Sequence, residues 1–141
     1  MRSNKDNFSL EQAYLSTIYR ILVLPPIDLK ISQFNEELHS YCLQNKINSW
    51  AFLSAFNPQS QLLSREENIH RHESLLYLLK KEGYSFEQAL GIPTNQEWET
   101  EKNLFIPNIS LTRAHSIAKR FDQKAFLFST NAIAKLHYTK K

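Results

Sequence analysis

The sequence is poor in glycine, cysteine and long apolar runs, and each shortage excludes a class of protein. Only two glycines occur among 141 residues, which excludes the glycine-rich loops that bind nucleotide phosphates. The single cysteine, Cys42, allows no internal disulfide and no multi-cysteine metal site. No apolar run reaches the roughly 18 residues of a membrane-spanning helix, and the polar N-terminus lacks the apolar core of a signal peptide. We therefore expect a cytoplasmic protein that does not bind a membrane.

The five histidines do not form a metal-binding pattern. His70 and His72 lie two residues apart, so on a helix they point in different directions. No His-Glu-x-x-His motif occurs, and we predict neither a metal nor a cofactor. The sequence also lacks the Gly-x-Ser-x-Gly turn that often marks nucleophilic catalysis by serine.

The composition is that of one globular domain. Hydrophobic residues make up 42% of the chain and aromatic residues 12%, enough for a core. We place this domain at residues 9–138, between a loose tail at 1–8 and a short tail at 139–141. The net charge of +3 is too small to indicate nucleic-acid binding, and the basic residues near the C-terminus are better explained as a solvated helix face.

The stretch from Trp50 to Leu79 organises the rest of the prediction. Residues 50–56 are almost all apolar, which favours a strand covered on both faces. Asn57-Pro58 ends this strand. Ser64 and Glu67 have the spacing of a capping box, so a helix is predicted from Ser64 to about residue 82, with Gly83 as its stop.

Strands and helices alternate along the chain, which is typical of the α/β class, with α+β as the alternative. We predict a mixed sheet of about five or six strands packed by three main helices. The strands fall at 17–24, 50–56, 84–92, 104–106, 125–128 and 132–138, and the main helices at 32–44, 64–82 and 110–121. A shorter helical segment begins at Ser9. The strand–helix–strand unit over 17–56 favours a parallel pair with a right-handed crossover.

The predicted helix at 64–82 changes character along its inner face. Leu75, Leu76 and Leu79 share one side, and the same side carries Asn68 and Arg71 nearer the start. A half-buried arginine needs partners, and the free N–H groups of a helix start attract anions. We therefore predict a bound anionic small molecule, of the phosphate or nucleotide type, at residues 57–71. In the alternative, Arg71 pairs with Glu67 and only staples the turn.

Several residue groups together resemble a bacterial family known as domain of unknown function 3293. They are Ala13-Tyr14, Ala55-Phe56-Asn57-Pro58 with Ser60, Leu63-Ser64 with Glu67-Asn68 and Arg71, Trp98 with a following glutamate, and Phe121-Asp122-Gln123-Lys124-Ala125. The resemblance covers almost the whole chain and implies no activity. The chain departs from the family pattern at two positions. Phe56 stands where a tryptophan or another aromatic residue is expected, and Asp122 stands where a glycine is usual. Either Glu99 or Glu101 matches the acid after the tryptophan.

Three functions remain open. The first is a ligand-binding module; the second is an interaction or structural protein in which the same residues only stabilise the fold; the third is a hydrolase or transferase using Glu67 and Arg71. The sequence does not indicate an enzyme above the other two, and it leaves the oligomeric state open. The residues expected at the site are Asn57, Ser60, Ser64, Glu67, Asn68, Arg71, Trp98 and Gln123.

Overall fold

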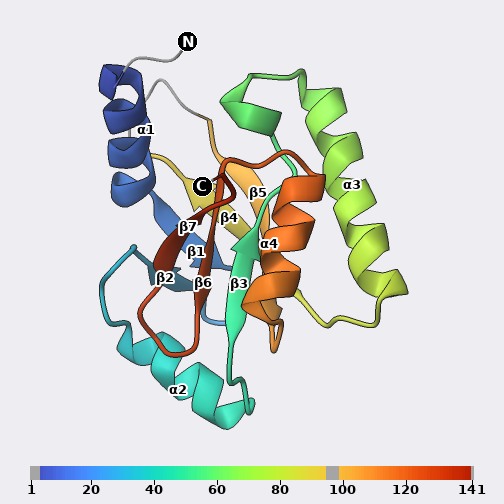
Figure 1. The fold of residues 1–141 in the computed structure, drawn as a ribbon. Coiled ribbons are helices and arrows are strands. Elements are labelled where there is room, and N and C mark those ends of the chain that lie inside the picture. Colours follow the sequence, from blue (N-terminus) through green and yellow to red (C-terminus); the bar gives the residue numbers. More distant parts are fainter. Residues whose placement is uncertain (1–3, 95–98, 141) are drawn as a thin grey trace.

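The computed structural model describes residues 4–94 and 99–140, which form four α-helices around one curled antiparallel sheet of seven strands (Figure 1). The helices are α1 (Asn4–Ser16), α2 (Glu36–Gln44), α3 (Arg65–Lys81) and α4 (Leu111–Arg120), with a 3₁₀ turn, η1 (Pro58–Ser60). The strands are β1 (Ile18–Ile21), β2 (Ile27–Leu29), β3 (Trp50–Leu53), β4 (Glu87–Ile92), β5 (Glu101–Pro107), β6 (Ala125–Ser129) and β7 (Lys135–Tyr138). Their order in the sheet is β2-β1-β4-β5-β3-β6-β7.

The predicted combination of helices and a sheet is confirmed, but the predicted parallel pair is wrong. All six pairs of neighbouring strands in the described part of the chain are antiparallel. β1 and β3 do not pair, because β4 and β5 lie between them. The turn after β1 folds β2 back on it as a hairpin, and β4 takes the other edge of β1. β2 has only three residues, too few for a clear alternating pattern, so the prediction gave fewer strands.

Several element boundaries also differ from those predicted: β1 and β3 end earlier, and β4 and β7 begin later. α1 begins at Asn4, within the range 1–8 that we expected to be a loose tail. α2 begins four residues later than predicted, because the Asn35 side chain caps it by accepting a hydrogen bond of 2.8 Å from the backbone N–H of Leu38. β5 begins at Glu101, in a segment that we expected to be irregular, and this earlier start brings a carboxyl group into the sheet.

The sheet separates two apolar cores. Trp50 and Phe52 of β3 face the side covered by α1 and α2, whereas Ala51 and Leu53 face α3 and α4. All four side chains are buried. The continuous apolar run therefore has the cause we predicted, cover on both faces, although the sheet is antiparallel.

The helix after β3 agrees with its sequence signals. Ser64 caps α3, and its hydroxyl accepts a hydrogen bond from the N–H of Glu67, whose carboxylate accepts one from the N–H of Ser64. Leu75 and Leu79 are fully buried in the core under α3. None of the helices in the described ranges is both long enough and apolar enough to cross a membrane.

Candidate functional site

Asn57, four residues after the end of β3, connects its own turn to the start of α3 and to β5. Its backbone is left-handed, with φ 47°, a conformation that asparagine tolerates better than most residues. Its side-chain oxygen accepts hydrogen bonds from Leu63 N–H at 3.0 Å and from the Asn68 amide at 2.8 Å. Its side-chain nitrogen donates to Glu101 Oε2 at 2.8 Å. The start of α3 is thus connected to the first residue of β5 through one amide.

Asn68 completes a reciprocal pair with this residue. Its side-chain oxygen accepts the backbone N–H of Asn57 at 2.8 Å, and only 6% of Asn68 is exposed. Each of the two asparagines thus donates one hydrogen bond to the other, which satisfies these buried polar groups. Both polar atoms of the Asn68 side chain are therefore hydrogen-bonded to the turn that precedes its own helix.

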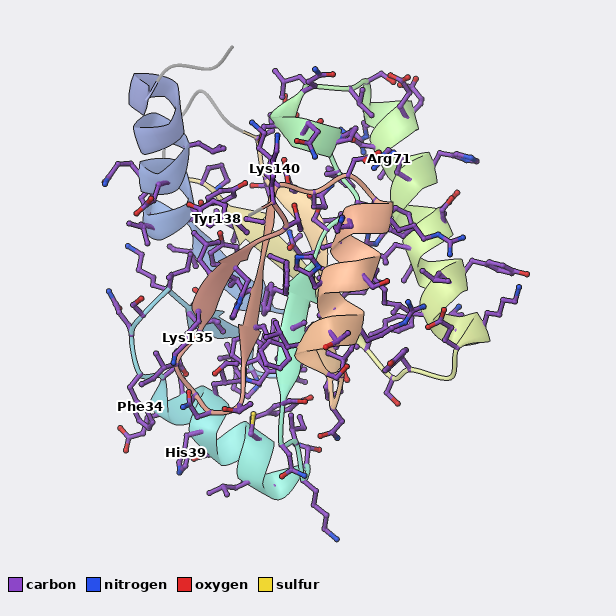
Figure 2. All side chains as sticks on the ribbon, in the orientation of Figure 1. Phe34, His39, Arg71, Lys135, Tyr138 and Lys140 are labelled. Carbon is purple, nitrogen blue, oxygen red and sulfur yellow. The ribbon has the colours of Figure 1, made fainter. Side chains whose placement is uncertain are left out.

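Arg71 points from α3 toward the C-terminal end of α4 (Figure 2). Its guanidinium donates to the carbonyl of Ala55 at 2.7 Å and to the carbonyl of Phe121, and it lies over the Phe121 ring at 5.9 Å. No ion pair joins it to Glu67: the ion pairs of the described residues are Arg20–Asp28 and Arg113–Glu82. The predicted staple between Arg71 and Glu67 is thus replaced by a link between α3, β3 and α4.

The Asn57 turn forms one wall of a cavity of about 120 Å³ at one end of the sheet. Ser60 and Gln123 line it as well, and the Gln123 amide donates to the carbonyl of Phe56 at 2.9 Å. Across from the turn, the lining comes from α1 and from strands on both sides of the curl. Its members there include Ala13, Tyr14, Thr17, Tyr19 and Phe52, whereas Glu101 lies next to the turn, within hydrogen-bond distance of Asn57.

A row of paired residues across three strands contributes a glycine to the cavity lining. Tyr19 of β1 pairs with Gly91 of β4, which pairs with Glu101 of β5. A Cβ at Gly91 would lie 3.2 Å from the Asn103 side-chain nitrogen and 3.9 Å from the Tyr19 ring. The missing side chain allows Asn103 and the Tyr19 ring to approach the backbone of Gly91, so this glycine serves close packing in the cavity wall.

The Glu101 carboxyl lies in the cavity wall, and its surroundings shift its pKa. Burial raises the pKa of Glu101 above its usual range, and the hydrogen bond from Asn57 offsets part of this effect. Neither of the two ion pairs of the described chain involves it. Burial raises the pKa of Tyr19 too, so its hydroxyl stays neutral. A partly buried acid with a perturbed pKa in a cavity is typical of a binding or catalytic site.

A buried histidine of α3 packs against Phe56, one of the residues that line the cavity. His72 is 4% exposed, its ring packs edge-on against Phe56, and its Nδ1 has no hydrogen-bond partner among the residues that the structure describes. Burial lowers the pKa of His72, so the ring is neutral at physiological pH. No group of three or more histidine, cysteine or acidic side chains with metal-binding geometry occurs in residues 4–94 and 99–140.

The expected site residues divide into groups. Asn57, Ser60 and Gln123 line the cavity. Asn68 and Arg71 lie behind its wall, and Ser64 and Glu67 are exposed at the start of α3. Trp98, the eighth, lies outside the residues that the structure describes.

Sequence reasoning did not pair Asn57 with Glu101. Glu101 was only one of two alternatives for the family acid; in the structure it is the acid that Asn57 binds, while Glu99 is exposed at the cavity lining. One signal was available in the sequence. Glu101, Asn103 and Phe105 alternate along β5, so two polar groups occupy a strand face that Phe105 marks as buried.

Comparison with known proteins gives a family but no activity. The sequence model of the family described as "Protein of unknown function (DUF3293)" matches residues 53–126. This range contains the last residue of β3, the Asn57 turn, α3, Glu101 and Gln123, whereas Ala13-Tyr14 of α1 lies outside it. Neither the curated proteins nor the solved structures yield a match.

Proposed function

Because this chain belongs to the DUF3293 family, whose description gives no activity, we propose its function from the site: it is a small-molecule binding module. The ligand occupies the cavity between α1, the Asn57 turn and the curled sheet. The observation that carries the proposal is the Glu101 carboxyl, which is held by Asn57 on the wall of an opening lined by aromatic rings. Concave, largely apolar sites with a few fixed polar groups are typical of ligand binding.

This location differs from the start of α3, where an anion was predicted. Asn68 is bound by Asn57, and Arg71 is bound by two carbonyl groups. An anion at that position would have to displace these contacts, and each displaced carbonyl or amide would then be buried without a partner. The contacts therefore favour the cavity over the helix start.

The second candidate is an interaction or structural protein in which residues 57–71 only hold the fold together. It is favoured by the same observation, since Asn57, Asn68 and Arg71 all bind other parts of the chain. The two candidates differ in what fills the cavity. A structural protein needs no ligand there, whereas a binding module loses its function when the cavity is filled.

Filling the cavity tests the proposal. Ala13→Leu places a larger side chain at the cavity lining, and Gln12→Leu makes a matched change at the exposed neighbouring position of α1. Saturation-transfer NMR and thermal shift would screen a mixed fragment library that includes amines, alcohols, inorganic phosphate and AMP. We expect fragments that bind the wild type and Gln12→Leu and lose at least tenfold in affinity for Ala13→Leu.

Three results would count against the proposal. Fragments that bind all three proteins equally would place binding outside the cavity, and the absence of any bound fragment would favour the structural candidate. Phosphate or AMP binding that survives Ala13→Leu but is lost in Arg71→Met would return the site to the start of α3. Circular dichroism and the melting temperature of each variant control for unfolding.

A further inference from the structure

We propose that the ligand of the cavity is a small organic cation, a protonated amine or amidine on a compact apolar body, and that the Glu101 carboxylate binds its positive group. This inference rests on the proposed function of the cavity and specifies the chemistry of its ligand. It uses the charge, the hydrogen bonds and the aromatic lining of the opening.

The first step is the charge that the protein leaves uncompensated. Asn57 donates a neutral amide N–H to Glu101 Oε2, which satisfies one oxygen but supplies no positive charge. Within the described ranges, Oε1 has no hydrogen-bond donor and no cation lies within ion-pair distance of the carboxyl. A partly buried carboxylate of this kind is stabilised by an incoming cation and opposes an incoming anion.

Two further charged side chains, Lys124 and Glu99, line the cavity. Among the described residues, no ion pair joins Lys124 to Glu101. Glu99 adds a second acid at the lining. The surroundings of the Glu101 carboxyl thus favour a positive group at this end of the opening.

The second step is the aromatic lining. Tyr14, Tyr19, Phe52 and Phe56 all contribute to the cavity, and the Tyr19 and Phe52 rings meet edge to face with centroids 5.7 Å apart. Aromatic faces attract ammonium and guanidinium groups, and more strongly where water is excluded. A carboxylate next to aromatic rings is therefore suited to a cation that carries an apolar body.

The third step is size. The cavity volume of about 120 Å³ is close to that of engineered cavities of roughly 150 Å³ that admit benzene. The ligand body is therefore about as large as one six-membered ring, with its charged group near Glu101. Benzylamine, benzyl alcohol and benzoate share such a body and differ only in the polar group, so they serve as matched probes.

Titration of these three probes by NMR and calorimetry tests the ligand class. For the wild type we expect benzylamine to bind at least tenfold more tightly than benzyl alcohol, and benzoate to bind weakest. Glu101→Gln keeps the shape of the side chain and its bond from Asn57; it should weaken benzylamine binding about tenfold or more and leave benzyl alcohol within threefold. Glu66→Gln, a matched change at an exposed residue of α3, should leave the affinity for all three probes unchanged.

A measurement on the wild type avoids any folding defect of a variant. The ¹³C resonance of the Glu101 carboxyl should shift on addition of benzylamine and stay in place with benzyl alcohol. Equal affinity of the amine and the alcohol, tighter binding of benzoate, or an unchanged Glu101 resonance would overturn the ligand class. The cavity itself would still be a binding site if the preferred probe lost affinity in Ala13→Leu. If Ala13→Leu binds every probe as the wild type does, the proposed function fails instead.

Discussion

Asn57 links stability and the candidate site at the level of a single residue. One side of its amide accepts hydrogen bonds from the start of α3, and the other donates to the acid in the cavity. The same side chain therefore fixes the turn and positions Glu101. Arg71 has a different role, because it binds main-chain carbonyls. These are the carbonyl of Ala55, two residues after β3, and that of Phe121, the residue after α4.

Replacing Arg71 tests this division. Arg71→Met keeps much of the apolar stem but removes both donors, which leaves the Ala55 and Phe121 carbonyls without their charged partner. We expect the free energy of unfolding to fall by about 2–4 kcal/mol, measured by urea denaturation, while the affinity for a cavity ligand is unchanged in the folded protein.

Arg65→Met supplies the control, since Arg65 is exposed at the first position of the same helix. It should change the free energy of unfolding by less than about 0.5 kcal/mol. An Arg71→Met protein as stable as the wild type would show that these carbonyls find other partners.

Among the elements, α3 depends on its first turn. The capping box satisfies two backbone N–H groups that would otherwise lack partners. It also brings Asn68 into position one residue further along the chain. At the other end, Gly83 has φ +80° directly after the C-cap Glu82, a conformation that favours glycine.

Removing the N-cap should weaken this helix measurably. Ser64→Ala is expected to lower the free energy of unfolding by about 1 kcal/mol, again by urea denaturation. Ser40→Ala, at an exposed position inside α2, tests for a general effect of losing a serine hydroxyl and should change stability by less than about 0.5 kcal/mol. Equal effects of the two substitutions would contradict the role of the cap.

The whole molecule is built on strands that are covered on both faces. β3 and β5 lie inside the sheet, and their alternating side chains enter both cores. β2 lies at one edge and β7 at the other. The cavity opens where α1 and the Asn57 turn meet this sheet, so the central strands supply a rigid base for the site.

Amide hydrogen exchange should reproduce this arrangement. We expect the largest protection factors in β3 and β5, because their amides are released only when the two cores open together. Amides of β2 and α1 should exchange faster, because an edge strand and a peripheral helix can open locally. Protection in β2 that equals protection in β3 would contradict the sheet order as the basis of stability.

Local signals sufficed to predict much of this fold. The apolar run at 50–56, the serine caps and the glycine stop act within a few residues, so β3, α3 and α4 are recognisable without the tertiary structure. Asn57 was likewise among the predicted site residues, although the anion itself was placed at the start of α3. The partner of Asn57 was not predicted, because a hydrogen bond across 44 residues leaves no local pattern.

The sequence by itself determined where β3 ends, where α3 and α4 begin and end, and which of their faces are apolar, because these follow from spacing along the backbone. Only the tertiary structure decided that the sheet is antiparallel and that Arg71 binds carbonyls. It also placed Asn57 and Gly91 next to Glu101. Strand order depends on which edges are left free after the hairpins form, and a cavity depends on which side chains meet across strands; neither is encoded in any single stretch.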